Sequence, residues 1–376
     1  MSGSKPRILV VDDDAGMTRT VARVLGRHYE VACVNSPSEA LETAGELSPD
    51  IAVVDIRMPE MNGFELMRRL RESLRDVDII MMTGNLEEPD ANLIRAIDEG
   101  AYYFIQKPFD RRVLLTLVAR CLELRRLRRE TNRYTRLLER ELEEARQFQE
   151  SLLPPSEKEL LGVSISARFR ACKELAGDFY DYTAVGDSAV AVLVADVVGH
   201  GASAAMLTGI VKSAFRSAHA EAFEPLAVVE RVKEGIRAFE ASRFVTLFAA
   251  RLGISDRRLE YVNAGHPAPI VRRADGEPLF LETTGPLISS ALADVAPVQN
   301  IVSLDADDLI VLYTDGLIEA RGTEGFFGKE RLVSLVTRDC APGGELLEQI
   351  LGALAEFSGS RPYQDDVTLV GVQLGE

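Results

Sequence analysis

The sequence predicts a multidomain chain in three parts. A doubly wound α/β domain with a five-stranded parallel sheet comes first, a long coiled-coil-like helix follows, and an α+β domain built as a β-sandwich flanked by helices comes last. The length of 376 residues exceeds the roughly 150 of an ordinary domain. The hydrophobic pattern also changes twice, so we place the domains at 1–120 and 154–376 and the helix at 121–153.

Composition excludes several classes of protein. Hydrophobic residues make up 46% of the chain, which is enough for packed cores. No apolar run approaches the roughly 20 residues that span a bilayer, and the first residues lack a signal-peptide pattern, so we expect a cytoplasmic protein without a membrane partner. The net charge of -16 argues against a nucleic-acid partner. The four cysteines form no CxxC pair, and we expect them to be small core residues.

The first domain is predicted from strand-like runs that alternate with helix-like segments. Such alternation indicates a parallel sheet with helices on its faces. The strand-like runs are RILVV, EVACV, IAVV, VDIIMMT and YYFIQ. The helix-like segments between them are Met17–Gly26, Ser38–Leu47, Phe64–Arg71 and Ala91–Glu99.

Acidic side chains follow two of these runs. Asp12 and Asp13 come after the first run and Asp55 after the third, so they should meet at the carboxyl edge of the sheet. Three neighbouring carboxylates need a cation, and an all-oxygen site suits Mg²⁺. One carboxylate can then act as a nucleophile toward a phosphoryl group. Thr83 after the fourth run and Lys107 after the fifth would offer a hydroxyl and a point charge to its oxygens.

Four motifs in this region, ILVVDDD, DIRMPEMNG, MMTG and KPF, occur in the order found in one family. Residues 7 to about 120 resemble the receiver domain of two-component response regulators. A strand-end Asp taken alone is more often a helix cap. The resemblance implies a sensor histidine kinase as partner. It also implies Asp55 as phosphoacceptor, Asp12, Asp13 and Asp55 around Mg²⁺, Thr83 as switch hydroxyl, Lys107 on the phosphoryl group and Phe104 at the aromatic switch position.

The middle of the chain has no glycine or proline from Arg111 to Leu153, which predicts one long helix. Seam positions alternate in steps of four and three, the spacing of a coiled coil, and predict a homodimer through this helix. Two of them, Thr131 and Glu141, are poor seam residues, so a weak or conditional dimer fits best. The alternative is a helix packed back on its own domain. The predicted seam is Leu127, Thr131, Tyr134, Leu138, Glu141, Ala145, Phe148 and Leu152.

After Pro154 the pattern changes to strands with hairpin breaks and separate helical stretches, which predicts an antiparallel sandwich flanked by helices. The strand-like runs are VSISARF, AVAVLVAD, FVTLFAARL, RLEYVNAG, APIVRR, LIVLYTDG and DDVTLVGVQL. The helical stretches are Ala202–Ala220, Pro225–Ala241 and Glu345–Phe357.

Acids recur at strand ends or turns of this domain, without a cluster of histidine or cysteine. Carboxylates alone select hard cations, Mg²⁺ or Mn²⁺. Their number suits two ions about 3.5 to 4 Å apart around an activated water for in-line attack on a phosphate. The small residues after Asp196 would let backbone groups, including the Val197 carbonyl, approach the ions. The acids are Asp178, Asp196, Asp315, Asp365 and Asp366.

The motifs AGDFYD, ADVVGHGASAAM, FVTLF, NAGHPAP, YTDGLIEA and DDVTLV occur in one order over about 150 to 374. They resemble the PPM-type serine/threonine phosphatases, specifically the bacterial RsbU/SpoIIE-type branch. The resemblance implies that Asp178, Asp196, the Val197 carbonyl, Asp315 and one of Asp365 or Asp366 bind metal, and Asp365 is favoured because the first position of the related Asp-Asn motif binds metal. Ala176 stands where glycine is common, and no arginine matches the phosphate-binding arginine of eukaryotic relatives.

Together these features predict a response regulator whose receiver controls a metal-dependent phosphatase of phosphoserine or phosphothreonine proteins. By resemblance the substrate is an anti-sigma-factor antagonist of the small STAS type. The alternative is a catalytically inactive phosphatase fold that only binds a partner, although the full acidic set is retained. His200 and His266 are further candidates for a general acid, or else structural hydrogen-bonding residues.

Overall fold

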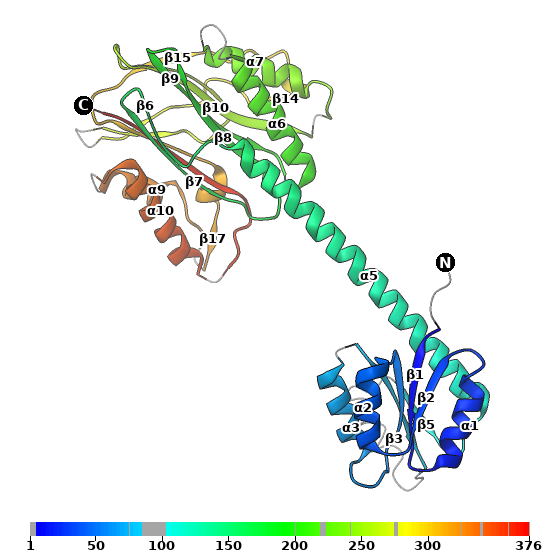
Figure 1. Cartoon of the computed structure of the whole chain (residues 1–376). Helices are drawn as coiled ribbons and strands as arrows, with labels where there is room; N and C mark the ends of the chain where they lie inside the picture. Colours follow the sequence, from blue (N-terminus) through cyan, green and yellow to red (C-terminus); the bar gives the residue numbers. More distant parts are fainter. Residues whose placement is uncertain are drawn as a thin grey trace. The chain divides into compact units, whose positions relative to one another are not determined.

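The structure is a computed structural model that describes residues 5–74, 76–84, 103–199, 201–218, 223–240, 242–273, 277–323, 325–338, 341–359 and 361–375. The chain forms two compact units, and the border between them falls between Leu138 and Glu139. This border lies inside one helix, α5 (Arg111–Leu152) (Figure 1). Among the helices of the described residues, none has the length and apolar character needed to cross a membrane.

The first unit is a parallel sheet with the strand order β2-β1-β3-β4-β5, and all of its strand pairs are parallel. The predicted five-stranded sheet is therefore confirmed. Its strands are β1 (Arg7–Val11), β2 (Glu30–Val34), β3 (Ile51–Asp55), β4 (Asp78–Thr83) and β5 (Tyr103–Gln106). Its helices are α1 (Ala15–Leu25), α2 (Pro37–Leu47), α3 (Gly63–Ser73) and the start of α5. The predicted helix Ala91–Glu99 lies outside the described residues.

Side chains alternate between the two faces of this sheet and form two cores. Leu9 and Val11 face the side covered by α2 and α3, where Phe64 is buried. Ile8 and Val10 face the side covered by α1 and α5. Helices on both faces leave the carboxyl edge of the strands open, which is where ligands bind in such sheets.

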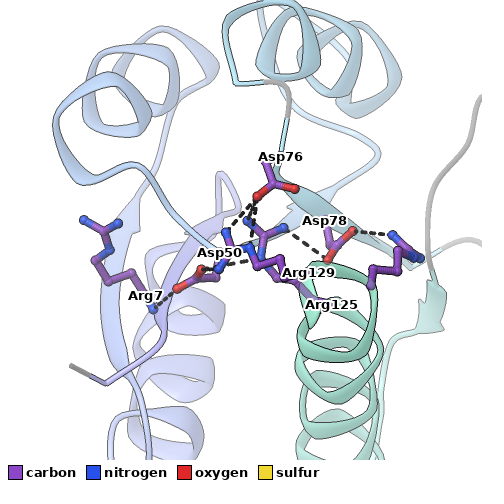
Figure 2. A network of polar contacts seen from close by, with 7 residues as sticks. Arg7, Asp50, Asp76, Asp78, Arg125 and Arg129 are labelled. Carbon is purple, nitrogen blue, oxygen red and sulfur yellow. Dashed lines mark hydrogen bonds and ion pairs between the residues drawn. The ribbon is translucent and has the colours of Figure 1, made fainter. Parts of the chain in front are cut away.

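Charged side chains at the amino edge of the same sheet form ion pairs with the first half of α5 (Figure 2). Arg125 is only 6% exposed, and its guanidinium lies 3.3 Å from both Asp76 and Asp78. It also lies 3.4 Å from Asp50. One turn further along, Arg129 Nη2 lies 2.8 Å from Asp76. The helix is thus bound to the first unit as far as Arg129.

From Leu127 onward the predicted seam of α5 is largely exposed. The exposed fractions are 52% for Leu127, 66% for Tyr134, 59% for Leu138 and 68% for Phe148. A helix packed back on its own domain would bury these side chains, so the structure disfavours that alternative for this stretch. The homodimer stays a prediction.

The second unit is a sandwich of two sheets, and all of its ladders are antiparallel. The first sheet has the order β15-β11-β10-β9-β8, with β14 paired to β10. It comprises β8 (Asp178–Val185), β9 (Ala189–Val197), β10 (Phe244–Gly253), β11 (Arg258–Ala264), β14 (Ile288–Ser289) and β15 (Asn300–Ser303). The second comprises β13 (Leu279–Phe280), β12 (Ile270–Arg272), β16 (Leu309–Tyr313), β19 (Val367–Leu374), β7 (Val163–Arg170) and β6 (Glu157–Leu160), in that order.

Helices cover the outer faces of this sandwich (Figure 1). α6 (Ala202–Ser217) and α7 (Pro225–Ile236) pack on the first sheet, and α9 (Lys329–Arg338) and α10 (Gly343–Ser358) on the second. A third core fills the space between the sheets. The short helix α8 (Asp315–Ile318) and the hairpin of β17 (Arg321–Gly322) and β18 (Gly325–Phe326) follow β16. The predicted sandwich is confirmed, but the sequence did not predict the elements β6, β8, β13, β14, β15, β17, β18, α8 and α9.

The cysteines only partly follow the expectation of core positions. Cys121 is fully buried, Cys172 is half-buried and Cys33 is exposed, so the prediction is wrong for Cys33. The reason is that β2 lies at the edge of its sheet, where only Val34 of its five residues is buried. Cys340 lies outside the described residues.

Candidate functional site

The carboxyl edge of the first sheet brings the predicted acids together. Asp12 directly follows β1 and Asp55 ends β3, and both side chains are buried, at 1% and 5% exposure. Asp13 is exposed beside them, and carboxylate oxygens of the three residues lie within 4.8 Å of one another. The next acid, Asp14, has another task, since its carboxylate accepts a hydrogen bond from Gly16 N at 2.7 Å and caps α1.

Lys107 supplies the counter-charge of this cluster. Its Nζ lies 2.6 Å from Asp12 Oδ2 and 2.7 Å from Asp55 Oδ1. Burial raises the pKa of Asp55, Lys107 lowers it, and repulsion from Asp12 adds to the rise. Burial alone would lower the pKa of Lys107, but the two carboxylates raise it above its ordinary value. Three carboxylates against one ammonium leave the edge negative, and this oxygen donor set fits a Mg²⁺ ion.

Two further predicted residues lie on the neighbouring strands. Thr83 ends β4 with 2% exposure, and its carbonyl accepts a hydrogen bond from Lys107 N at 2.6 Å. Phe104 is half-buried on β5. The structure therefore places Thr83 next to the lysine loop that contacts Asp55.

In the second unit, Asp178 and Asp196 lie opposite each other on neighbouring strands. Asp178 opens β8, Asp196 lies near the end of β9, and the two residues are cross-strand partners. Burial first, and then repulsion from Asp196, raises the pKa of Asp178 well above its ordinary value. Burial and repulsion from Asp315, Asp365 and Asp366 raise the pKa of Asp196 to about 7. Asp196 therefore lies within electrostatic reach of the other four predicted acids.

Asp315 and the Asp365–Asp366 pair come from the second sheet. Asp315 is the first residue of α8, directly after β16, and its pKa is raised by burial and by repulsion from Asp365. Gly316 packs so closely that a Cβ there would lie 1.9 Å from the Asp366 carbonyl oxygen. Only glycine permits this approach, which joins the α8 segment to the segment before β19.

Two threonines fix the orientation of Asp178. Its Oδ2 accepts hydrogen bonds from Thr314 Oγ1 at 2.7 Å and from Thr368 Oγ1 at 2.6 Å, and both threonines are fully buried. Thr368 N in turn donates to Thr314 Oγ1 at 3.0 Å. Sequence reasoning missed these two residues, although each lies within two positions of a predicted acid. Through them Asp178 of the first sheet is bonded to the residue directly after β16 and to β19 of the second sheet.

The neighbouring acids Asp365 and Asp366 have different environments. Asp366 is 2% exposed, and its two carboxylate oxygens accept hydrogen bonds from Cys172 N at 2.8 Å and Gly177 N at 2.7 Å. Asp365 is exposed, and its Oδ1 accepts from Asp366 N at 2.9 Å. Asp366 therefore holds the loop that leads into β8, while Asp365 faces solvent.

The turn after β9 has the backbone geometry that its glycines suggested. Gly199 and Gly201 have φ angles of 88° and 83°, a region that favours glycine. A Cβ on Gly177 would lie 2.4 Å from the Val197 carbonyl oxygen, so this carbonyl lies directly against the residue before Asp178. Gly177 was not singled out from the sequence, and the metal role of the Val197 carbonyl stays a prediction.

The end of α5 also reaches this loop. Gln149 is 8% exposed, its Nε2 donates to the Ala176 carbonyl at 2.8 Å, and its Oε1 accepts from Ala176 N at 3.0 Å. Lys212 of α6 donates to the Leu152 carbonyl and lies 3.3 Å from the buried Asp181. The last turn of the helix is thus bonded to the backbone two residues before Asp178.

His266 is buried in the NAGHPAP loop, an environment that favours the neutral imidazole. Burial lowers its pKa to about 3, and its Nδ1 lies 3.0 Å from Thr246 Oγ1. Its backbone N–H donates to Asn263 Oδ1 at 2.8 Å. A structural role therefore fits His266 better than that of a general acid. His200 lies outside the described residues.

Comparison with known proteins agrees with this division. The family described as Stage II sporulation protein E (SpoIIE) matches residues 186–375, about half of the chain, and the response regulator receiver domain matches residues 8–119. Protein IcfG of Synechocystis is 29% identical over 262 residues, which are 62% of this chain and 41% of IcfG. Phosphoserine phosphatase RsbP of Bacillus subtilis is 27% identical over 241 residues, which are 62% of this chain and 58% of RsbP. The chain thus spans less than two thirds of either relative.

A solved structure supports the fold of the second unit. The SiaA-PP2C domain of Pseudomonas aeruginosa superposes with a TM-score of 0.56 at 23% identity. The match covers 64% of this chain and 98% of that domain. At this identity the likeness shows the fold alone.

Proposed function

Because the chain belongs to the SpoIIE family and carries a response regulator receiver domain, we propose that it is a metal-dependent protein serine/threonine phosphatase controlled by phosphorylation of Asp55. The observation that carries the proposal is that Asp178 and Asp196 are cross-strand partners, and that the segments of Asp315 and Asp366 pack directly against each other at Gly316. Buried carboxylates this close repel one another, and bound cations relieve the repulsion. The name of RsbP, a phosphoserine phosphatase, supports the same chemistry for this chain.

The donor set of the second unit suits two Mn²⁺ or Mg²⁺ ions, because all of its donors are oxygen atoms. Asp178, Asp196, Asp315, Asp365 and the Val197 carbonyl would hold them. When bound, such ions neutralise a phosphate and lower the pKa of a water nucleophile. Thr314 and Thr368 would keep Asp178 in one orientation, and Asp366 would hold the loop. Asp365 is favoured over Asp366 because both oxygens of Asp366 already accept backbone hydrogen bonds.

In the receiver, Asp12, Asp13 and Asp55 would hold one Mg²⁺, and Asp55 would accept a phosphoryl group from a sensor histidine kinase. Lys107, which contacts Asp55 at 2.7 Å, would shift its contact to the phosphoryl oxygens. Thr83 would provide a hydroxyl to the same group. This exchange of partners is the local change that a receiver needs to act as a switch.

The long helix would connect the two activities. We place the receiver at 1–120, the helical linker at 121–153 and the phosphatase domain at 154–376. The exposed seam side chains of α5 support a homodimer through this linker. Gln149 would pass a change in the helix to the backbone before Asp178. The substrate we propose is a phosphoserine or phosphothreonine protein, namely an anti-sigma-factor antagonist of the STAS type.

Turnover of the purified chain tests the enzyme. We expect Mn²⁺-dependent hydrolysis of p-nitrophenyl phosphate and of a phosphoserine protein. Asp196→Asn and Asp315→Asn should each lower turnover by more than about a hundredfold, since even outer residues of metal sites cost 10- to 100-fold. Asp187→Asn, which changes an exposed acid in the turn before β9, is the matched control and should keep full activity. An unaffected Asp196→Asn variant would contradict the metal assignment, and tight partner binding without turnover would favour the inactive adaptor.

Control by the receiver is tested in the same assay. Treatment with beryllofluoride, a phosphoryl mimic, should change turnover or the mass measured by light scattering. Asp55→Asn should abolish the response because it lacks the carboxylate that binds the mimic. Identical mass and turnover in both states would contradict receiver control.

A further inference from the structure

The β17–β18 hairpin and the segment before Asp365 enclose a cleft of about 660 Å³. Two of its lining side chains are basic, one is aromatic and one is an amide. The lining residues are Arg321, Gly322, Gly325, Phe326, Arg361 and Gln364. Neither the metal site nor the receiver switch uses them.

Chain connectivity places this cleft beside the acid cluster of the second unit. Arg361 precedes Asp365 by four positions, and Gln364 is its direct neighbour. An extended chain covers at most about 3.3 to 3.6 Å per residue, so Arg361 lies within about 14 Å of Asp365. On the other side, β17 follows the helix α8 that Asp315 begins. Both walls of the cleft are therefore continuations of segments that bear predicted metal ligands.

The hairpin is held firmly on α10. A Cβ on Gly322 would lie 2.7 Å from the ring of Phe357, so the hairpin backbone rests directly on that ring. Phe327 is buried and packs edge-on against Phe357 at 5.6 Å. Arg331 Nη1 donates to the carbonyls of Phe326 at 3.0 Å and Phe327 at 2.7 Å. Because these contacts already hold the hairpin in place, it would lose little conformational entropy when a ligand binds to its side chains.

The two arginines of the cleft lack acidic partners within the described part of the chain. The guanidinium of Arg321 lies over the ring of Phe326 at 5.3 Å, and Phe326 is 52% exposed. Arg361 donates one hydrogen bond to the Gly322 carbonyl, which orients it toward the hairpin. By contrast, Arg168 and Arg216 of the same unit each pair with a carboxylate at 2.6 Å. Both arginines are exposed, and the cleft is therefore a positively charged site on a chain of net charge -16.

We propose that this cleft binds acidic side chains that flank the phosphoserine or phosphothreonine of the protein substrate. The inference rests on the proposed phosphatase activity and names the substrate class of the same site. Charge complementarity selects the occupant, because an acidic segment would gain two guanidinium partners while the rest of this acidic chain repels it. With about 3.3 Å per residue and a reach of about 14 Å, the acids would lie within about four positions of the phosphorylated residue.

Two synthetic phosphoserine peptides test the inference on the full chain with Mn²⁺. They share one sequence, except that the four positions on either side of the phosphoserine carry glutamates in one and lysines in the other. Arg321→Glu should lower kcat/KM for the glutamate peptide by about tenfold, the effect of reversing a charge at an interface rim. Arg361→Glu should act in the same direction. Hydrolysis of p-nitrophenyl phosphate, which has no flanking residues, should not change.

Arg231→Glu is the matched control, because Arg231 is an exposed arginine on α7 without an ion pair among the described residues. It should leave kcat/KM for both peptides unchanged. Arg321→Lys keeps the positive charge and should retain most of the preference for the glutamate peptide. Equal kcat/KM for the two peptides in the wild type would overturn the inference. So would an equal loss on p-nitrophenyl phosphate in Arg321→Glu and Arg361→Glu, which would reveal a general defect. A wild-type chain that hydrolyses none of the three substrates would instead overturn the proposed phosphatase activity itself.

Discussion

The two acid clusters of this chain balance their charge in different ways. In the receiver, Lys107 lies 2.6 Å from Asp12 and 2.7 Å from Asp55, so the chain supplies a cation of its own. In the second unit, Asp178 accepts hydrogen bonds from hydroxyl groups and Asp366 accepts them from backbone N–H groups. Hydroxyl and amide donors orient a carboxylate but do not cancel its charge.

The consequence is visible in the acid pKa values of the second unit. Burial and mutual repulsion raise the pKa of Asp196 to about 7, and the pKa of Asp178 is also well above its ordinary value. A receiver needs to bind and release one phosphoryl group, and a lysine that can change partners serves this purpose. A hydrolase needs ions that stay in place, and a buried carboxylate such as Asp178, which is held by hydroxyl donors, keeps a strong demand for them.

The largest effect that would sharpen the comparison of the two acid clusters is a loss of Mn²⁺ affinity or of loop stability at the Asp365–Asp366 pair. Asp365→Asn should weaken Mn²⁺ binding by tenfold or more, roughly as ligand-shell losses do, without unfolding the domain. Asp366→Asn should instead destabilise the loop from Cys172 to Gly177. The Asn side chain has one oxygen and one NH₂ group, so it cannot accept both of the backbone hydrogen bonds that the two oxygens of Asp366 accept. Mn²⁺ titration by calorimetry and thermal unfolding separate the two effects. The reverse pattern would make Asp366 the ligand.

Strand patterns and acids were accessible from the sequence because they are local signals. The five strands of the receiver were predicted from apolar runs, and Asp12, Asp13 and Asp55 do meet at the carboxyl edge. The sandwich was also predicted, and in it Asp196 lies within electrostatic reach of the other four predicted acids. These successes depend on rules of strand geometry that hold in any such sheet.

Contacts between distant segments were not accessible. Thr314 and Thr368 bond to Asp178 across 136 and 190 positions of sequence, and no local pattern marks that meeting. Gln149 looks like an ordinary polar residue of an exposed helix, although it is buried against Ala176. Strand β8 was missed because acids and tyrosines interrupt its apolar pattern, yet pairing with β9 overrides this.

A smaller effect is expected when the receiver loses its internal cation. Lys107→Gln leaves the buried Asp12 and Asp55 facing each other, as the acids of the second unit do. We expect the first unit to lose about 1 to 3 kcal/mol of stability, the usual cost of an unpaired buried group, and to regain part of it with Mg²⁺. Amide hydrogen exchange of β1 and β3 in the full chain measures this, with Lys158→Gln on β6 as control. Unchanged exchange in Lys107→Gln would show that the lysine is not needed to balance these acids.

The smallest effect concerns the pH dependence of stability in the second unit without metal. The folded-state pKa of Asp196, about 7, exceeds the roughly 3.9 of an unfolded aspartate. Between these values the folded chain binds more protons than the unfolded chain, so stability falls as the pH rises from about 4 to 7. With a chelator, the melting temperature of this unit should be higher at pH 5.5 than at pH 8, by roughly 4 °C for a change near 1 kcal/mol.

Two additions to this melting experiment identify the cause of the pH dependence. Asp196→Asn removes one of the charges and should flatten the profile between pH 5.5 and 8. Mn²⁺ should shrink or reverse the difference in the wild type, because ions bind the deprotonated carboxylates and release their protons. A wild-type profile that matches Asp196→Asn would mean that groups of the chain itself already balance the repulsion among these carboxylates, as Lys107 does for Asp12 and Asp55. The contrast between the two acid clusters would then no longer hold.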